Sequence, residues 1–171
     1  MYKKGPEHLP EPYRTLTLKL LRALLGVFRD KLWSLVVYGS VARGDYKRDS
    51  DIDLLLVIED LPKSRLERVK LFLKAEEKLD EELDRLLGEG YAVTFSPVIK
   101  TPEEAEKVSP LYLDMVEDAI IVYDKKGFFE RVLLKLKKRL KELNAERVKL
   151  GKKWYWRLKR DYKFGEVITL G

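Results

Sequence analysis

Two acidic residues in the first third of the chain have the types and spacing that metal-assisted chemistry needs. Asp51 and Asp53 lie two positions apart at the start of an aliphatic run, so on a β-strand both carboxylates point to the same face. Like charges there repel each other, and a divalent cation would relieve the repulsion. Carboxylate oxygens suit Mg²⁺, which also takes substrate phosphates as ligands. On spacing alone, two solvated acids at the end of a strand are the simpler interpretation.

A glycine–serine pair shortly before these acids has the features of an anion site. Gly39 follows the apolar run 33–38, and a glycine there lets the backbone approach a ligand closely. Ser40 stands where this predicted strand meets a short predicted helix, so N–H groups and a hydroxyl point outward. An ordinary turn with a serine cap is the alternative for this pair taken alone. Together, the loop offers phosphate donors and the next strand offers metal ligands, which fits a triphosphate chelated by Mg²⁺.

The arrangement over residues 38–58 resembles a known family. A Gly-Ser pair, a short variable loop and an Asp-hydrophobic-Asp triplet at the head of an aliphatic strand are similar to the motif of the DNA polymerase beta-type nucleotidyltransferase superfamily. The match is greatest with its minimal, single-domain prokaryotic and archaeal members. Ala42, Arg43, Gly44 and Ser50 strengthen the resemblance. It implies the nucleotidyltransferase fold.

The resemblance also implies roles for individual residues. Gly39 and Ser40 would hold the β- and γ-phosphates, and Arg43 would contact phosphate. Asp51 and Asp53 would be the catalytic, metal-binding acids, with Mg²⁺ or Mn²⁺ as the cofactor. Such enzymes move a nucleoside monophosphate from a nucleoside triphosphate to an acceptor hydroxyl and release pyrophosphate.

The sequence departs from the family pattern at the third metal ligand. Active members usually add a carboxylate from a neighbouring strand, but the corresponding segment 91–97 has no Asp or Glu. Thr94 and Ser96 are the expected equivalents, and a hydroxyl is a weaker ligand than a carboxylate. Glu103 or Glu104 is a further possible source. Nucleotide binding is therefore better supported by the sequence than turnover.

Hydrophobic periodicity predicts helices alternating with strands around this motif. Helices are expected over 15–31, 64–87, 128–143, and more briefly after Thr101 and over 109–117. Strands are expected over 33–38, 51–58, 91–99 and 119–123. The strand 51–58 is apolar on both faces, as a central strand should be. The predicted class is α/β or α+β, with a small mixed sheet, helices packed mainly on one face, and a C-terminal basic helix and arm.

Three segments are expected along the chain. Residues 1–14 form a proline-rich, extended lead-in, residues 15–124 form the nucleotidyltransferase core, and residues 125–171 form a basic amphipathic helix followed by an aromatic and basic arm. The net charge of +6 is unevenly distributed, because residues 125–163 hold sixteen Lys or Arg and only four Asp or Glu. This excess favours a polyanionic partner such as nucleic acid, or a solvated basic helix.

The remaining composition limits the function classes. A chain with no Cys has neither disulfides nor Cys-based metal sites, and His8 is its single His, so no His-rich metal cluster is possible. The sequence contains no signal-peptide pattern and no apolar run of membrane-spanning length, so a soluble, cytoplasmic protein is expected. The charged fraction of 37% is typical of proteins from hot environments. For the aromatic arm, packing of Trp154 and Trp156 on the core or on a second subunit is favoured over stacking on bases.

Three functions stay open at this stage. The first is an enzyme that transfers a nucleotidyl group to an acceptor that the sequence does not identify. The second is a non-catalytic, antitoxin-like nucleotide-binding module that acts with a helical protein partner. The third is nucleic-acid binding through residues 125–163. A homo-oligomer is compatible with all three.

Overall fold

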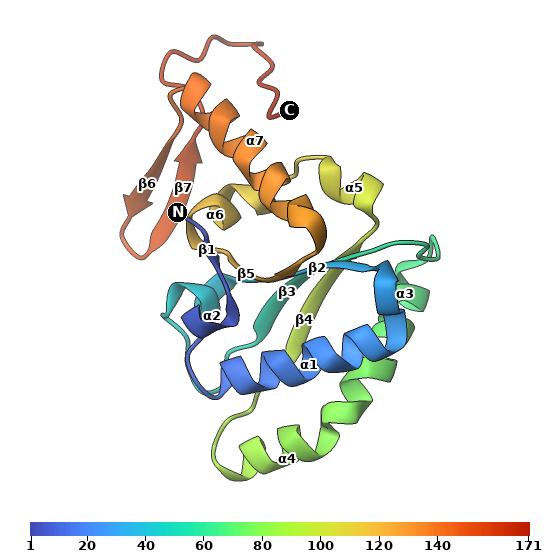
Figure 1. Ribbon diagram of the computed structural model, residues 1–171. Coiled ribbons are helices and arrows are strands. Elements are labelled where there is room, and N and C mark those ends of the chain that lie inside the picture. Colours follow the sequence, from blue (N-terminus) through green and yellow to red (C-terminus); the bar gives the residue numbers. More distant parts are fainter.

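The computed structural model describes residues 1–171 and is built on a five-stranded mixed sheet with strand order β1-β5-β2-β3-β4 (Figure 1). The strands are β1 (Lys3–Lys4), β2 (Leu32–Tyr38), β3 (Ile52–Ile58), β4 (Phe95–Lys100) and β5 (Ile120–Asp124). β2 is antiparallel to both neighbours, β3 and β5, whereas β3 runs parallel to β4 and β1 runs parallel to β5. The predicted α/β class is confirmed, and β3 lies inside the sheet as its apolar sequence predicts.

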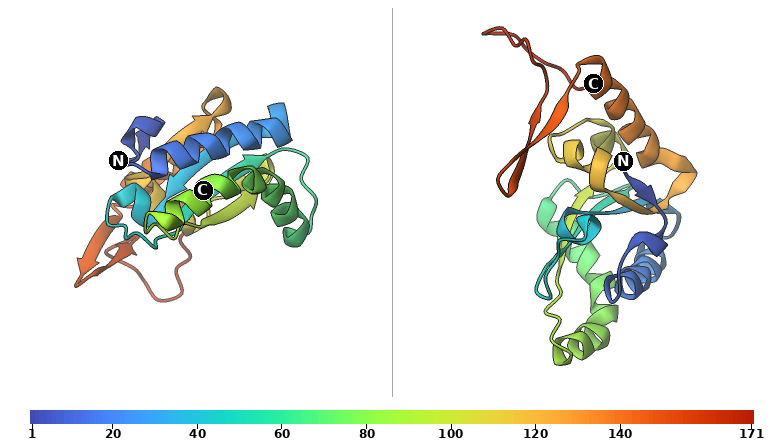
Figure 2. Two further views of the ribbon diagram at one scale, coloured as in Figure 1. Left: turned by 90° about the horizontal axis from the view of Figure 1, so that it is seen from below. Right: turned by 90° about the vertical axis from the view of Figure 1, so that its left-hand side faces the viewer.

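Helices cover both faces of this sheet, not mainly one as the sequence suggested (Figures 1 and 2). One face carries α1 (Tyr13–Phe28), α3 (Arg65–Glu76) and α4 (Asp80–Gly88). The other carries α5 (Pro102–Glu106), α6 (Leu111–Asp118) and α7 (Phe128–Glu142). The reason is visible in β3, where Leu54 and Leu56 enter the first apolar cluster while Leu55 and Val57 enter the second. A strand that is apolar on both faces needs cover on both sides.

Burial makes β3 a rigid support for the acids at its start. Every residue of β3 except Asp53 is fully buried. Burying one leucine or isoleucine side chain stabilises a fold by roughly 1.5–3 kcal/mol. The position of Asp53 is therefore fixed by the apolar residues that follow it, and the short helix α2 (Gly39–Arg43) is fixed by β2 in the same way.

Two predicted elements have different bounds in the structure. The long helix expected over 64–87 is divided into α3 and α4 by a tighter 3-10 turn at Glu77–Leu79. The strand expected from Tyr91 begins only at Phe95, because Ala92 N–H donates to the carbonyl of Arg48 instead of to the sheet. A backbone N–H group that donates to a loop carbonyl cannot also donate to a neighbouring strand.

The two ends of the chain contain structure that the sequence did not predict. In the lead-in, β1 pairs with β5 and a 3-10 turn follows at Pro6–His8. In the arm, β6 (Glu146–Leu150) and β7 (Lys153–Arg157) form an antiparallel hairpin separate from the main sheet. The hairpin lies at the margin of the molecule in all three views (Figures 1 and 2). An isolated two-stranded hairpin is only marginally stable, so its contacts with the body decide its position. No helix of the fold is both long and apolar enough to cross a membrane.

Candidate functional site

An open pocket of about 430 Å³ lies at the end of β2 and brings most of the predicted site residues together. Its lining residues are Tyr38, Gly39, Ser40, Arg43, Asp53, Leu111, Asp114 and Asp118. Two segments form the sides of this pocket. The strand wall consists of Gly39, Ser40 and Arg43 from α2, which directly follows β2, and Asp53 from β3. The helix wall consists of Leu111, Asp114 and Asp118 from α6.

The strand wall depends on close contact between the glycine–serine bend and the acid of β3. Tyr38 and Asp53 are partners in the β2–β3 register, so the bend begins directly beside Asp53. Gly39 has a φ of +76°, and a Cβ at this position would overlap the Asp53 carboxylate. Glycine is therefore needed both for the backbone conformation and for the approach of the acid. The Asp53 side chain faces the bend, as the metal–phosphate hypothesis requires.

The two acids of the predicted metal pair differ in their surroundings. Asp53 is half-buried, and its pKa is raised mainly by burial and further by repulsion from Asp51, while Arg43 acts in the opposite direction. Asp51 is exposed just before β3, and its carboxylate accepts a hydrogen bond from the Thr94 hydroxyl. Burial and the charge of Asp51 both disfavour the ionised form of Asp53, and a cation placed beside this carboxylate would act in the opposite direction.

Hydroxyl groups lie where the family resemblance implies a third metal ligand. The parallel register of β3 and β4 sets Ser96 beside Asp53, and Thr94 already contacts Asp51. Glu104 does not reach this position, because its carboxylate is bound by Arg68 at 2.7 and 2.8 Å. No group of three or more His, Cys, Asp or Glu side chains could hold a metal anywhere in the fold. Two carboxylates with neighbouring hydroxyls still fit Mg²⁺, which often binds one or two protein carboxylates together with substrate phosphates.

The loop between the bend and β3 is held by aromatic residues. The Tyr13 hydroxyl donates to the backbone carbonyl of Lys47 at 3.0 Å, and its ring lies edge-on to Tyr46 with the centroids 4.8 Å apart. The guanidinium of Arg48 lies 5.0 Å from the centre of the Tyr91 ring. Arg48 thus has a cation–π partner that orders the loop.

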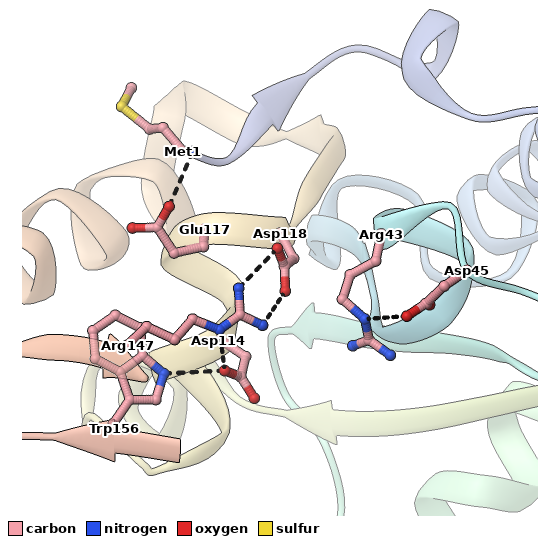
Figure 3. Close-up of polar contacts among 8 residues, drawn as sticks. All are labelled: Met1, Arg43, Asp45, Asp114, Glu117, Asp118, Arg147 and Trp156. Carbon is pink, nitrogen blue, oxygen red and sulfur yellow. Dashed lines mark hydrogen bonds and ion pairs between the residues drawn. The ribbon is translucent and has the colours of Figure 1, made fainter. Parts of the chain in front are cut away.

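The helix wall is the part of the site that sequence reasoning missed. Asp114 and Asp118 are four residues apart, so α6 presents both on one face. Arg147 of β6 donates to the two carboxylate oxygens of Asp118 at 3.2 and 2.7 Å, and its Nε lies 3.4 Å from Asp114 (Figure 3). Trp156 of β7 donates from Nε1 to Asp114 at 3.0 Å. The i, i+4 spacing of the two acids was the available signal, but only the tertiary structure shows that they face the bend.

Comparison with known proteins identifies the family of this chain. Residues 21–154 match the family described as "Nucleotidyltransferase domain", and the chain belongs to that family. This confirms the resemblance found in the sequence.

Two relatives come from Methanocaldococcus jannaschii. The protein named "Putative protein adenylyltransferase MJ1305" is 29% identical over 129 residues, which is 74% of this chain and 82% of the relative. "Putative protein adenylyltransferase MJ0141" is 29% identical over 75 residues, which is 44% of this chain and 71% of the relative. Among solved structures, a toxin–antitoxin crystal structure with AMP-PNP aligns with a TM-score of 0.46 and 18% identity, over 74% of this chain and 91% of that one.

Proposed function

We propose that this protein is a metal-dependent nucleotidyltransferase that moves a nucleoside monophosphate from a nucleoside triphosphate to an acceptor hydroxyl and releases pyrophosphate. One observation carries the proposal. The Asp53 carboxylate and the Gly39–Ser40 bend share a pocket and approach each other so closely that no side chain fits at Gly39. Phosphate donors and a metal-binding acid therefore stand within reach of the same triphosphate.

Each residue of the strand wall has a role in this proposal. Gly39 and Ser40 bind the terminal phosphates through backbone N–H groups and a hydroxyl, and Arg43 adds a positive charge beside them. Asp51 and Asp53 hold Mg²⁺ or Mn²⁺, with Thr94 and Ser96 near the third position. The bound cation would neutralise phosphate charge and lower the pKa of the attacking hydroxyl. The chain's own contribution is to fix the triphosphate and the acceptor in line.

The relatives favour particular substrates. Both matched relatives from Methanocaldococcus jannaschii carry names of protein adenylyltransferases, and one of them aligns over 82% of its length. We infer ATP as the nucleotide and a hydroxyl-bearing protein side chain as the acceptor. This substrate class is compatible with an open pocket, since a macromolecular acceptor must approach the bound nucleotide from solvent.

The second candidate is a non-catalytic nucleotide-binding module that acts with a helical protein partner. The observation in its favour is the hydroxyl-only third position, because Thr94 and Ser96 replace the carboxylate that active relatives usually have. A site of this composition would bind the nucleotide and metal yet turn over slowly.

Nucleic-acid binding through residues 125–163 is less favoured by the packing. The apolar face of α7 is buried against the sheet, and Trp156 is bound to Asp114. Several of the basic side chains in this segment are paired with acids, among them Arg139, Arg147, Arg157, Lys159 and Arg160. Fewer free positive charges leave a weaker electrostatic attraction for phosphate backbones.

A labelling experiment separates these functions. Purified protein is incubated with Mg²⁺, ATP labelled on the α-phosphate and a protein extract as acceptor, and nucleotide binding is measured in parallel by calorimetry. Transfer of label that depends on Asp51 and Asp53 supports the enzyme. Binding of Mg–ATP without transfer to any acceptor supports the binding module. Absence of Mg–ATP binding overturns both.

A further inference from the structure

We propose that Arg147 is a positioning residue for the nucleotide site: it offsets half of the negative charge of the helix wall, so that Arg43 stays available and the pocket accepts a polyanion. This inference rests on the proposed nucleotide-binding function. It assigns a purpose to the β6–β7 hairpin, which lies outside the glycine–serine and Asp-x-Asp motif.

The charges that line the pocket create the problem that Arg147 solves. Three carboxylates, those of Asp53, Asp114 and Asp118, line the pocket together with a single guanidinium, that of Arg43. Mg²⁺ on the strand wall would offset the charge of Asp53, but the two acids of the helix wall are not among that cation's predicted ligands. Uncompensated carboxylates facing a triphosphate repel it, and the repulsion is strong in a partly desolvated pocket.

Arg147 is built to supply the missing charge. Its side chain is only 15% exposed, and the guanidinium forms a fork with Asp118 while its Nε lies beside Asp114. Its other side lies 4.7 Å from the centre of the Trp154 ring, so an aromatic face holds the guanidinium from behind. A bidentate pair with such support is well fixed, and lysine cannot reproduce its geometry.

Asp118 lies between two guanidinium groups, those of Arg147 and Arg43 (Figure 3). Arg43 bonds only to the exposed Asp45, at 3.3 Å. Because Arg147 already occupies both oxygens of Asp118, this acid does not compete with a phosphate for Arg43. Without Arg147, Asp118 would attract Arg43 and withdraw it from the nucleotide.

A purely structural role for Arg147 makes a different prediction. If this arginine only attached the hairpin to α6, then removing its acidic partners would detach the hairpin and weaken the site as removal of Arg147 does. If it balances charge, removing the acids compensates for its loss. The two roles are therefore distinguished by combining the changes.

The test measures Mg–ATP affinity by calorimetry for the full chain and four variants. Arg147→Ala is expected to weaken binding at least about tenfold, more at low ionic strength. The affinity of Arg147→Lys for Mg–ATP should lie between those of wild type and Arg147→Ala. The double variant Asp114→Asn/Asp118→Asn should bind more tightly than wild type. Adding Arg147→Ala to this double variant should recover affinity to within about threefold of wild type, because no unpaired acid remains.

Two results would overturn the proposal, and thermal unfolding shows that each variant is folded. One is wild-type affinity in Arg147→Ala. The other is a triple variant that binds as weakly as Arg147→Ala, which would leave only hairpin attachment or direct phosphate contact. The function proposed above fails separately, when the wild type does not bind Mg–ATP or when Asp51→Asn/Asp53→Asn leaves its affinity unchanged. If the wild type does not bind Mg–ATP, the proposed role of Arg147 is overturned together with the proposed function.

Discussion

The two walls of the pocket are stabilised in different ways. The strand wall continues from β2 and β3, whose residues are almost all buried, so its geometry follows from the apolar core. The helix wall lies on α6, which is also packed in the apolar core, but its two carboxylates are held by polar contacts from a hairpin that belongs to no larger sheet, through Arg147 and Trp156. The site thus joins a wall whose acid is positioned by a buried strand to a wall whose acids are oriented by a few directional hydrogen bonds. The first should tolerate little change, and the second can be altered without unfolding the protein.

The largest difference between the walls should appear in catalysis. Asp53→Asn removes a proposed metal ligand of the strand wall and should lower the rate of nucleotidyl transfer by about a thousandfold or more, since bound metal supplies several kcal/mol of charge stabilisation. Asp60→Asn is the matched control at the other end of β3, where Asp60 is exposed and has a positive φ that asparagine also adopts. Equal rates in the two variants would contradict the assignment.

The second largest difference should appear in stability, when an apolar side chain is truncated in β3 or in the hairpin. Leu55→Ala in β3 removes a fully buried side chain and should lower the free energy of unfolding by about 2–5 kcal/mol. Leu150→Ala in the hairpin, where the side chain is 72% exposed, should change it by less than about 0.5 kcal/mol. Denaturant titrations of both variants provide the measurement. A large loss from Leu150→Ala would mean that the hairpin folds as part of the core.

Two glycine substitutions test how tightly the strand wall is built. Gly39 and Gly44 both have positive φ, at +76° and +87°, so alanine should cost about 1–3 kcal/mol at either position. Only at Gly39 would the new Cβ overlap Asp53, while nothing lies within 4 Å of a Cβ at Gly44. Mg–ATP affinity should therefore fall in Gly39→Ala and be largely kept in Gly44→Ala. A similar loss in both would point to backbone strain as the sole cause.

The ion pair between Arg68 and Glu104, beside β4, can be set against the Arg147 pair of the helix wall, because its contribution to stability should depend on pH. The hydrogen bonds from Arg68 lower the pKa of Glu104 below its usual value of 4.5. The pair therefore stabilises the fold fully above that usual value and loses its contribution as pH falls through the lower folded-state pKa. Because Glu104 is 43% exposed, Glu104→Gln should cost only about 1 kcal/mol at neutral pH. The free energy of unfolding, measured between pH 7 and pH 3, should decrease less with falling pH in this variant than in wild type.

The smallest effect is expected from the tryptophan that holds the hairpin. Trp156→Phe keeps the aromatic ring but removes the Nε1 donor to Asp114, so docking should weaken by about 1 kcal/mol. Amide hydrogen exchange should become faster within residues 146–157 while β2 and β3 remain protected. Faster exchange in β3 as well would show that the two walls are coupled.

The sequence predicted the strand wall well for a physical reason. The glycine–serine bend and the Asp-x-Asp segment are neighbours along the chain, and the pairing of β2 with β3 sets Asp53 beside the bend. Asp51 lies just before β3 and does not line the pocket. The central position of β3 likewise follows from its unbroken apolar run. Which helices cover which face depends on tertiary packing, as in the placement of α5, α6 and α7 opposite α1, and the periodicity of each helix does not contain that information.

The helix wall could not be predicted in the same way. Asp118 and Arg147 are 29 residues apart, and their contact depends on how α7 returns the chain to α6. The hairpin turns at Gly151, which has a φ of +63°, between strands rich in Lys and Arg. Its charged sequence resembles a solvated arm, and only the contacts of Trp156 and Arg147 show that one face is docked.

β4 is an edge strand of the main sheet, and an unpaired edge strand can form backbone hydrogen bonds with a strand of a second chain. Pro97 lies in the middle of this strand and has no N–H group to offer. The side chains of Arg68 and Glu104 are bonded to each other beside the strand's final residues. Growth of the sheet into fibres along this border is thereby discouraged, and any stable association between copies would have to use a different surface.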